Sequence, residues 1–334
     1  MKISVDAGAL CGGHKFGTHV VTHNLLEALG RYDKENNYIG YLYKRTSHLP
    51  ISENTKFKIL KPSLAWMSFR VSIEEMTHPK DIYLGLSQAI PWFSKAKILA
   101  FMHGLSFHYH KELYPDSYEA LKDQVMFATS RANKIIVSSS RVQQELSDQF
   151  GHKDSVVLPF GIPFDMEEYG KVNKTGNPYF LFVGMNHPVK NIEYLVKAFT
   201  IFKEQNLHKD FELILVGNHE IRSDPALGIR SVKADRSELR DLYRNATAYL
   251  SASLYESYNL PVLEALSQDC RVIGKSSAII PEFRSYVKIA DEIEDFVDEM
   301  KHTTVTKSVQ IRDAVLEKFN WERYVTKLVK SYQS

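Results

Sequence analysis

The chain has 334 residues, of which 44% are apolar and 25% charged, a composition typical of globular proteins and not of disordered ones. At this length we expect two domains of ordinary size, each with a core of its own. The formal net charge of +2 gives no whole-chain argument for nucleic-acid binding, and two cysteines are too few for a disulfide framework.

The amino-terminal residues and the hydropathy pattern predict a cytosolic protein. Residues 1–13, MKISVDAGALCGG, lack the apolar core of a signal peptide, and no run approaches the ~18 apolar residues of a membrane span. Cys11 and Cys270 cannot build a disulfide framework and have no metal-ligand spacing, which together indicate a reducing compartment. Peripheral contact with a membrane remains compatible with this pattern.

The first residues predict the opening of a nucleotide-binding α/β domain. A short alternating strand, Lys2–Ala7, precedes a glycine-bearing loop at 12–17, and apolar residues with helical spacing follow from Val20 to Leu29. A strand, a glycine loop and a helix in this order open many nucleotide-binding units. The dinucleotide fingerprint G-x-G-x-x-G is absent, which disfavours a nicotinamide enzyme.

Further apolar or alternating segments extend this domain. Strands are expected at 38–43, 57–60, 81–84, 97–102 and 134–138, and helices at 69–76, 116–131 and 141–150. His103 directly follows one of these strands, at the carboxyl end where α/β proteins bind ligands. A lone histidine is more often structural, so this position alone does not assign it a function.

The pattern starts again after a polar segment, 165–177, which we interpret as a linker. Strands are expected at 179–184, 211–217, 230–234 and 247–253, and helices from 191 and at 237–246. The restart predicts a second α/β domain.

The most informative stretch is 250–266, LSASLYESYNLPVLEAL, which predicts a strand, a polar loop and a helix. Pro261 fits the first helical turn because its missing N–H would be unbonded there anyway. The helix N-terminus would attract a phosphate or diphosphate, flanked by Glu256 and Glu264 as acceptors for hydroxyls. A diphosphate with a hydroxylated group on either side describes a nucleotide sugar. The alternative is a surface loop and an amphipathic helix with two solvated acids.

SLYESYNLPVLEAL resembles the Glu-x7-Glu signature of the family 4 retaining glycosyltransferases, and further segments follow in the family's order from Met1 to about Tyr332. The resemblance implies the GT-B fold, an α/β architecture in which two Rossmann-like domains with parallel sheets face a central cleft. It implies an acceptor domain at 1–164, a linker at 165–177 and a donor domain at 178–318. Residues 319–334 would form a terminal helix that packs back on the N-terminal domain.

The resemblance also implies roles for individual residues. Glu256 would bind a hydroxyl of the transferred sugar, Glu264 the ribose hydroxyls, and Lys190 the diphosphate. His103 matches the histidine of the family's H-D-x-x-F segment, which lies beside the donor sugar, so we expect catalytic roles for Glu256, His103 and Lys190. Other donor contacts are expected from Gly13, Asn191, Val232, Lys233, Ser257, Tyr258, Asn259 and Leu260.

The sequence departs from the family pattern at several of these positions. Met185 stands where many relatives carry an arginine, so His187 or Lys15 would have to supply one diphosphate contact. Gly104 replaces the usual aspartate, and Ser257 and Asn259 replace glycines. Gln268 and Asp269 stand where the family has Cys-Gly.

The resemblance implies a hexosyltransferase that transfers a sugar with retention of configuration from a nucleotide diphosphate donor to a glycan or lipid-linked glycan. It implies no cofactor and no metal, because Lys190 and the helix N-terminus offset the diphosphate charge. The signature looks most like polysaccharide-building mannosyltransferases, so GDP-mannose is the first choice of donor and UDP-sugars come next. The departures motivate a second hypothesis, a catalytically silent relative that serves as a binding or scaffold partner. A third is an enzyme that acts on a nucleotide sugar without transferring it, such as an epimerase.

Overall fold

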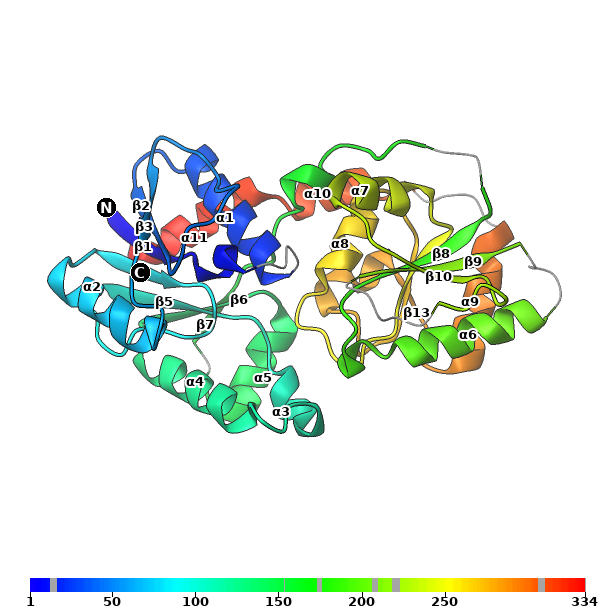
Figure 1. Cartoon of the computed structure of the whole chain (residues 1–334), viewed down its shortest axis with the longest axis horizontal. Helices are drawn as coiled ribbons and strands as arrows, with labels where there is room; N and C mark the ends of the chain where they lie inside the picture. Colours follow the sequence, from blue (N-terminus) through cyan, green and yellow to red (C-terminus); the bar gives the residue numbers. More distant parts are fainter. Residues whose placement is uncertain are drawn as a thin grey trace. The chain divides into compact units, whose positions relative to one another are not determined.

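The structure is a computed structural model that describes residues 1–12, 17–152, 154–172, 176–205, 210–217, 223–305 and 310–333. The chain divides into two units (Figure 1). Unit 1 comprises Met1–Gly161 and Phe319–Ser334, and unit 2 comprises Ile162–Lys318. Within the described ranges, no helix combines the length and the apolar character that crossing a bilayer requires.

Unit 1 contains a seven-stranded sheet in the order β3-β2-β1-β4-β5-β6-β7, and each neighbouring pair is parallel. Its strands are β1 (Lys2–Asp6), β2 (Asn37–Leu42), β3 (Thr55–Ile59), β4 (Ile82–Gly85), β5 (Lys97–Met102), β6 (Lys134–Val137) and β7 (Ser155–Val157). Its α-helices are α1 (Thr18–Tyr32), α2 (Ser72–Thr77), α3 (Ser106–Tyr109), α4 (Tyr118–Arg131), α5 (Ser140–Phe150) and α11 (Trp321–Gln333). A π-helical segment, Trp66–Val71, leads into α2, so this helical stretch begins three residues earlier than the sequence pattern predicts.

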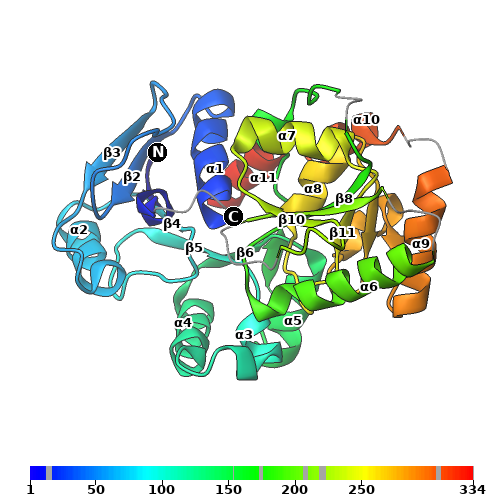
Figure 2. The same cartoon turned by 45° about the vertical axis from the view of Figure 1, so that its right-hand side comes forward.

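The last helix, α11, packs beside α1 within unit 1 (Figures 1 and 2). Trp321 is 2% exposed and stacks on Phe160, with ring centroids 6.4 Å apart. The backbone of Gly161 passes so close that an added Cβ would lie 2.6 Å from the Trp321 ring. The apolar face of α11 therefore completes the core of unit 1.

Unit 2 repeats the architecture with a six-stranded parallel sheet in the order β10-β9-β8-β11-β12-β13. Its strands are β8 (Tyr179–Val183), β9 (Glu212–Val216), β10 (Ile229–Val232), β11 (Ala248–Ser251), β12 (Val272–Gly274) and β13 (Lys288–Ile289). Its α-helices are α6 (Ile192–Glu204), α7 (Arg236–Asn245), α8 (Leu260–Ser267), α9 (Ile293–Val305) and α10 (Arg312–Lys318). Buried phenylalanines of β8 and α6 centre its core, with the rings of Phe180 and Phe202 5.2 Å apart. The two parallel-sheet, Rossmann-like units confirm the predicted fold class.

The described part of the predicted linker is held on unit 2 by specific contacts. Gln268, which is fully buried, donates from its amide to the carbonyl of Met166 (2.9 Å) and accepts from the N–H of Gly170 (2.8 Å). The hydroxyl of Tyr169 donates to Asp269 (2.6 Å), and the guanidinium groups of Arg244 and Arg312 each lie 4.1 Å from the Tyr169 ring. Gln268 and Asp269, two departures from the family pattern, therefore anchor this segment.

Candidate functional site

The topology of unit 2 places two loops side by side at the carboxyl end of its sheet. Strand order reverses between β8 and β11, and in open α/β sheets ligands bind at the carboxyl ends of strands beside such a switch point. The loop after β8 and the loop after β11 are joined by a hydrogen bond from the N–H of Leu254 to the carbonyl of Val189 (2.8 Å). The amide of Asn191 donates to the carbonyl of Ala252 (3.2 Å) and adds a second link.

These loops bring Lys190 and Glu256 together although 66 positions separate them in the sequence. Lys190 Nζ lies 2.6 Å from Glu256 Oε1, and Ser253 Oγ donates to the same oxygen at 2.8 Å. The two side chains are 20% and 12% exposed, so the pair is largely shielded from water yet remains reachable. The candidate cation for a diphosphate and the candidate acceptor for a sugar hydroxyl thus form one cluster.

Two asparagines shape these loops through left-handed backbone conformations. Asn191 has φ 52° and Asn259 has φ 66°, a region that asparagine tolerates better than most residues. The amide of Asn259 donates to Ser251 Oγ and to the carbonyl of Ala278, both at 2.9 Å, and the residue is 5% exposed. The side chain that replaces the family's glycine therefore points into the protein and leaves the loop surface unobstructed.

The loop after β11 leads into α8 with its large side chains turned inward. Tyr258 is 4% exposed and packs edge-on against Phe283, with ring centroids 5.3 Å apart, and Leu260 is 9% exposed. These two residues can therefore offer a ligand little besides their backbone. Ser257 is half-buried beside Glu256.

Glu264 lies in α8, four residues after its first residue, and is 2% exposed. Arg236 Nη1 donates to Glu264 Oε1 at 2.7 Å, and the hydroxyl of Tyr243 donates to Oε2 at 3.1 Å. Arg236 also forms a two-pronged pair with Asp165, at 2.7 and 2.8 Å. Burial raises the pKa of Glu264, and the guanidinium of Arg236 opposes this rise.

Arg236 is the main site residue that the sequence analysis did not identify. It is the first residue of α7, placed there by a capping box in which Asp235 and Glu238 each bond to the other's backbone N–H. The run Asp235-Arg-Ser-Glu238 carries this signal in the sequence. The predicted helix began at Ser237, so Arg236 fell just outside it.

Val232 and Lys233 lie at the end of β10, the edge strand of the sheet. With Ala234 they line a cavity of about 870 Å³ that extends to Tyr179 and Glu212 at the amino ends of β8 and β9. The structure therefore places these two predicted donor contacts at a cavity, along the edge of the sheet.

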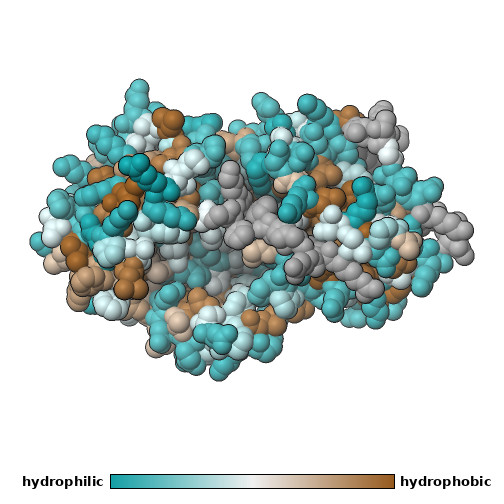
Figure 3. Space-filling model, in the orientation of Figure 1, coloured by the Kyte–Doolittle hydropathy of each residue, from teal (hydrophilic) through white to brown (hydrophobic). Residues whose placement is uncertain are grey.

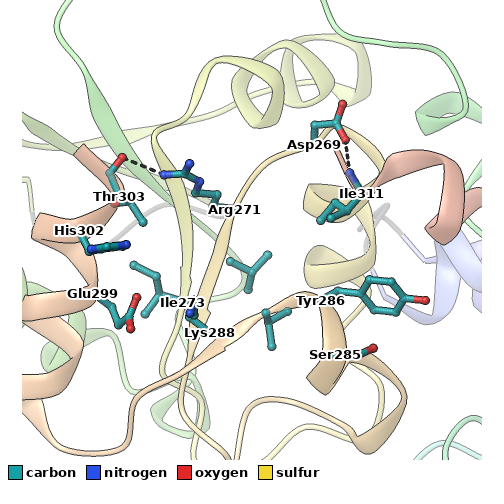
Figure 4. A pocket seen from close by; sticks show the side chains of 12 residues that line it. Asp269, Arg271, Ile273, Ser285, Tyr286, Lys288, Glu299, His302, Thr303 and Ile311 are labelled. Atoms are coloured by element: carbon teal, nitrogen blue, oxygen red, sulfur yellow. Dashed lines mark hydrogen bonds between the residues drawn. The ribbon is translucent and has the colours of Figure 1, made fainter. Parts of the chain in front are cut away.

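A second cavity of unit 2, about 490 Å³, lies away from this cluster (Figure 4). Its lining includes Arg271 and Val272 at the amino end of β12, with Lys288, Glu299 and His302. Arg271 donates to the carbonyl of Thr303 at 3.1 Å. Because Lys190 and Glu256 follow the carboxyl ends of their strands, this cavity is separate from the predicted donor site.

In unit 1, His103 lies at the carboxyl end of β5 and is half-buried. Its Nε2 bonds to the carbonyl of Leu86, and because a carbonyl oxygen only accepts, Nε2 carries the proton. Burial lowers the pKa of His103, and the hydrogen bond to Leu86 opposes this shift. The following Gly104 has φ 142°, a conformation that L side chains rarely adopt, so the backbone favours glycine at this position.

Three further residues were predicted to contact the donor diphosphate or to approach it, namely Gly13, Lys15 and His187. Gly13 and Lys15 lie outside the described residues. His187 accepts the N–H of Val189 through Nδ1 (3.2 Å), and burial followed by the charge of Lys190 lowers its pKa. A neutral His187 cannot replace the charge of an arginine at Met185, which is 54% exposed. Among the described residues, no three His, Cys, Asp or Glu side chains group as metal ligands would.

Comparisons with known proteins add to this geometry. Residues 177–304 match the family model described as Glycosyl transferases group 1. The chain is 24% identical over 249 residues to YqgM, an uncharacterized glycosyltransferase of Bacillus subtilis, covering 67% of the chain and 66% of the relative. It is 24% identical over 209 residues to RfbU, the O-antigen chain mannosyltransferase of Salmonella typhimurium, covering 55% and 56%.

Among solved structures, sucrose-phosphate synthase from Thermosynechococcus elongatus matches with a TM-score of 0.75 at 17% identity, over 99% of this chain and 98% of that one. This likeness shows the GT-B fold. The chain spans between 44% and 66% of the length of the curated relatives it matches. The matches together support a glycosyltransferase family.

Proposed function

We propose that the protein is a retaining hexosyltransferase of the family 4 type that moves a sugar from a nucleotide diphosphate donor to a glycan or lipid-linked glycan. The observation that carries the proposal is the Lys190–Glu256 pair at the switch point of unit 2, in the loops that precede α6 and α8. Glu264 follows in α8 at the spacing of the Glu-x7-Glu signature.

The proposed chemistry is leaving-group stabilisation by fixed charges. Departure of the nucleoside diphosphate leaves negative charge on its phosphate oxygens, which Lys190 and the N-terminus of α8 would stabilise. We propose that these two features suffice without a metal ion. Glu256 would accept a hydrogen bond from the transferred sugar and hold its reacting carbon in place.

Glu264 would bind the ribose of the donor. A carboxylate has about four acceptor sites, and Arg236 and Tyr243 use one on each oxygen. Each oxygen therefore keeps capacity for one of two neighbouring ribose hydroxyls. Attack on the same face as the leaving group, with the leaving phosphate taking the acceptor's proton, would retain the anomeric configuration without a separate base.

GDP-mannose is the donor that we propose first, with UDP-sugars as the alternative. The sequence of residues 250–266 supports mannose because it resembles that of polysaccharide-building mannosyltransferases. The relative from Salmonella typhimurium is also named a mannosyltransferase. The same resemblance supports the predicted role of His103 in unit 1 and a place in polysaccharide biosynthesis.

Thermal stabilisation by GDP, UDP, ADP and dTDP, each with and without magnesium, tests the proposal. A ligand that binds the native state alone raises its stability by mass action. We expect one nucleotide to raise the Tm without magnesium, and the shift to disappear in Lys190→Ala and Glu264→Ala. No shift with any of the four would contradict the proposal and favour the silent relative. NMR of the product's anomeric proton then tests retention, and product formation without acceptor would indicate an epimerase.

A further inference from the structure

The helical stretch Trp66–Thr77 in unit 1 buries two acidic side chains and exposes three large apolar ones. Its acids face inward: Glu74 is 3% exposed and Glu75 is fully buried. Three of its apolar side chains face outward: Phe69 is 56% exposed, Ile73 41% and Met76 42%, whereas Val71 is fully buried and Trp66 and Met67 pack against the core of unit 1. A surface helix normally buries its apolar stripe and exposes its charges.

Both buried acids have hydrogen-bond or ion-pair partners, so their inward position is a built feature and not a packing fault. Glu75 accepts hydrogen bonds from the hydroxyls of Tyr41 (2.7 Å) and Ser94 (3.2 Å). Glu74 pairs with Lys58 at 2.6 Å and with Arg70 at 3.7 Å. Buried charges persist where they are paired or hydrogen-bonded, as they are here.

A neighbouring loop extends the exposed apolar area. The N–H of Phe93 donates to Ser72 Oγ at 3.2 Å, which fixes the loop beside α2. Phe93 is 60% exposed and Trp92 52%, and Leu64, just before the helical stretch, is 84% exposed. Figure 3, in the orientation of Figure 1, shows hydrophobic side chains at the surface over α2. We name the following residues the α2 surface: Leu64, Phe69, Ile73, Met76, Trp92 and Phe93.

The border of the α2 surface is basic. Lys61 and Lys95 are exposed, and Arg70 lies against Lys61, donating to its carbonyl at 2.8 Å. Residues 55–97 contain seven lysines and arginines against three acids, a net charge of +4, whereas the whole chain carries +2. Two of those three acids are the buried and paired Glu74 and Glu75.

We propose that the α2 surface binds the surface of a membrane that contains anionic lipids. Exposed Trp and Phe side chains with a basic border are the chemistry that enters the headgroup region and attracts anionic lipid. A second copy of the chain fits less well, because two such borders would bring like charges together. The inference rests on unit 1 alone and does not depend on the proposed transfer reaction.

Co-sedimentation with vesicles of phosphatidylcholine, with and without phosphatidylglycerol, tests this inference. We expect binding to the anionic vesicles that weakens with added salt. Exchange of Phe69, Trp92 or Phe93 for serine should lower the partition coefficient roughly tenfold each. Lys61→Gln and Lys95→Gln should lower it about fivefold each.

Met126→Ser is the matched control, because Met126 is 50% exposed on α4 of the same unit, outside the α2 surface. Its binding should equal that of the unchanged protein. All these side chains are exposed, so the variants should keep their Tm within about 2 °C.

Tryptophan fluorescence gives an independent reading of the same contact. The chain has three tryptophans, of which Trp321 is buried and Trp66 packs on Tyr43, whereas Trp92 is 52% exposed. Anionic vesicles should shift the emission to shorter wavelength, and Trp92→Phe should remove the shift while binding persists. The proposal is overturned if anionic vesicles do not bind, or if the serine variants bind as well as the unchanged protein. A dimer that the serine variants abolish, without vesicle binding, would instead make this surface a protein interface.

Discussion

Lys190 Nζ lies 2.6 Å from Glu256 Oε1, so the proposed diphosphate cation has an anionic partner within the protein. A diphosphate would compete with Glu256 for this lysine. Donor binding would therefore release the Glu256 carboxylate at the moment when a sugar hydroxyl arrives to use it. In the proposed donor complex, the pair would couple the phosphate and sugar ends of the donor.

Lys190→Ala should weaken the binding of a nucleoside diphosphate roughly tenfold to a hundredfold, because a hydrogen-bonded charge contact is lost. The corresponding nucleoside, which has no phosphate, should bind equally to both proteins. Lys190→Arg is the control that keeps the charge. Isothermal titration calorimetry measures the affinity of each protein for the nucleoside diphosphate and for the nucleoside. An unchanged diphosphate affinity in Lys190→Ala would contradict the assignment of Lys190 to the diphosphate.

Glu256→Gln should strengthen the binding of the nucleoside diphosphate but slow sugar transfer. Removing the carboxylate frees Lys190, so the nucleoside diphosphate should bind about fivefold more tightly. Sugar transfer should fall roughly hundredfold, because the reacting carbon is no longer held in place. Calorimetry and initial rates measure the two effects.

Asp298→Asn is the control for this variant, because Asp298 also forms a pair in unit 2, with Lys301 at 2.7 Å, and lines neither cavity. It should change neither the affinity nor the rate. Weaker nucleotide binding in Glu256→Gln would show that the ion pair does not compete with the diphosphate.

Arg236→Met should leave the buried Glu264 without its cation and destabilise the fold by about 3 kcal/mol. It should also reduce the preference for a ribonucleotide over its 2′-deoxy form, since Glu264 would no longer be held as an ionised acceptor. The groups near Glu264 are Arg236, Tyr243, Asp165 and Tyr249, with Arg312 bonded to the carbonyl of Ser267 on the same helix.

The loss of unfolding free energy in Arg236→Met should grow as the pH rises from acidic to neutral. Burial raises the pKa of Glu264, and without Arg236 the pKa rises further. A carboxyl whose folded-state pKa is raised contributes stability below its unfolded pKa and loses it as pH rises through the folded value. Denaturant unfolding should therefore show the smallest deficit at acidic pH and a growing deficit toward neutral pH.

Arg240→Met is the matched control for Arg236→Met. Arg240 lies on the same helix and donates to the carbonyl of Asp165 at 3.3 Å. It should leave both the ribose preference and the pH dependence of stability unchanged. Equal changes of ribose preference and of pH-dependent stability in the two variants would show that Arg236 acts through its contact with residues 165–172 and not through Glu264.

His103 should titrate below the ordinary histidine value of 6.5, because burial disfavours its charged form. NMR of the imidazole C–H signals, assigned with His103→Gln, measures the midpoint. A midpoint for His103 at or above 6.5 would mean that the ring is not shielded from water.

Much of the fold could be predicted because its signals are local. Hydrophobic runs identified strands such as β8 and β9. Pro261 predicted the start of helix α8 to within one residue. The spacing in the 250–266 stretch correctly placed Glu256 in a loop and Glu264 in a helix. The switch point that joins Lys190 to Glu256 depends on strand order, which no local pattern reports.

The contacts that were missed are all long-range. Arg236 meets Glu264 across two helices, and Tyr169 lies between Arg244 and Arg312 because three separate segments converge on it. The polar residues at 165–172 were predicted as a linker because their partners lie about a hundred positions away. Polar side chains that bond to distant partners look like solvent-exposed ones when the sequence is read locally.

The return of α11 to unit 1 sets the order in which the protein can be completed during synthesis. All of unit 2 leaves the ribosome before Trp321 does, so unit 2 can fold while unit 1 still lacks its last helix. Until then the apolar side of α1 and the ring of Phe160 have no helix to cover them. A nascent chain paused before residue 319 should therefore expose a chaperone-binding surface on unit 1, although most of unit 1 is synthesised before unit 2.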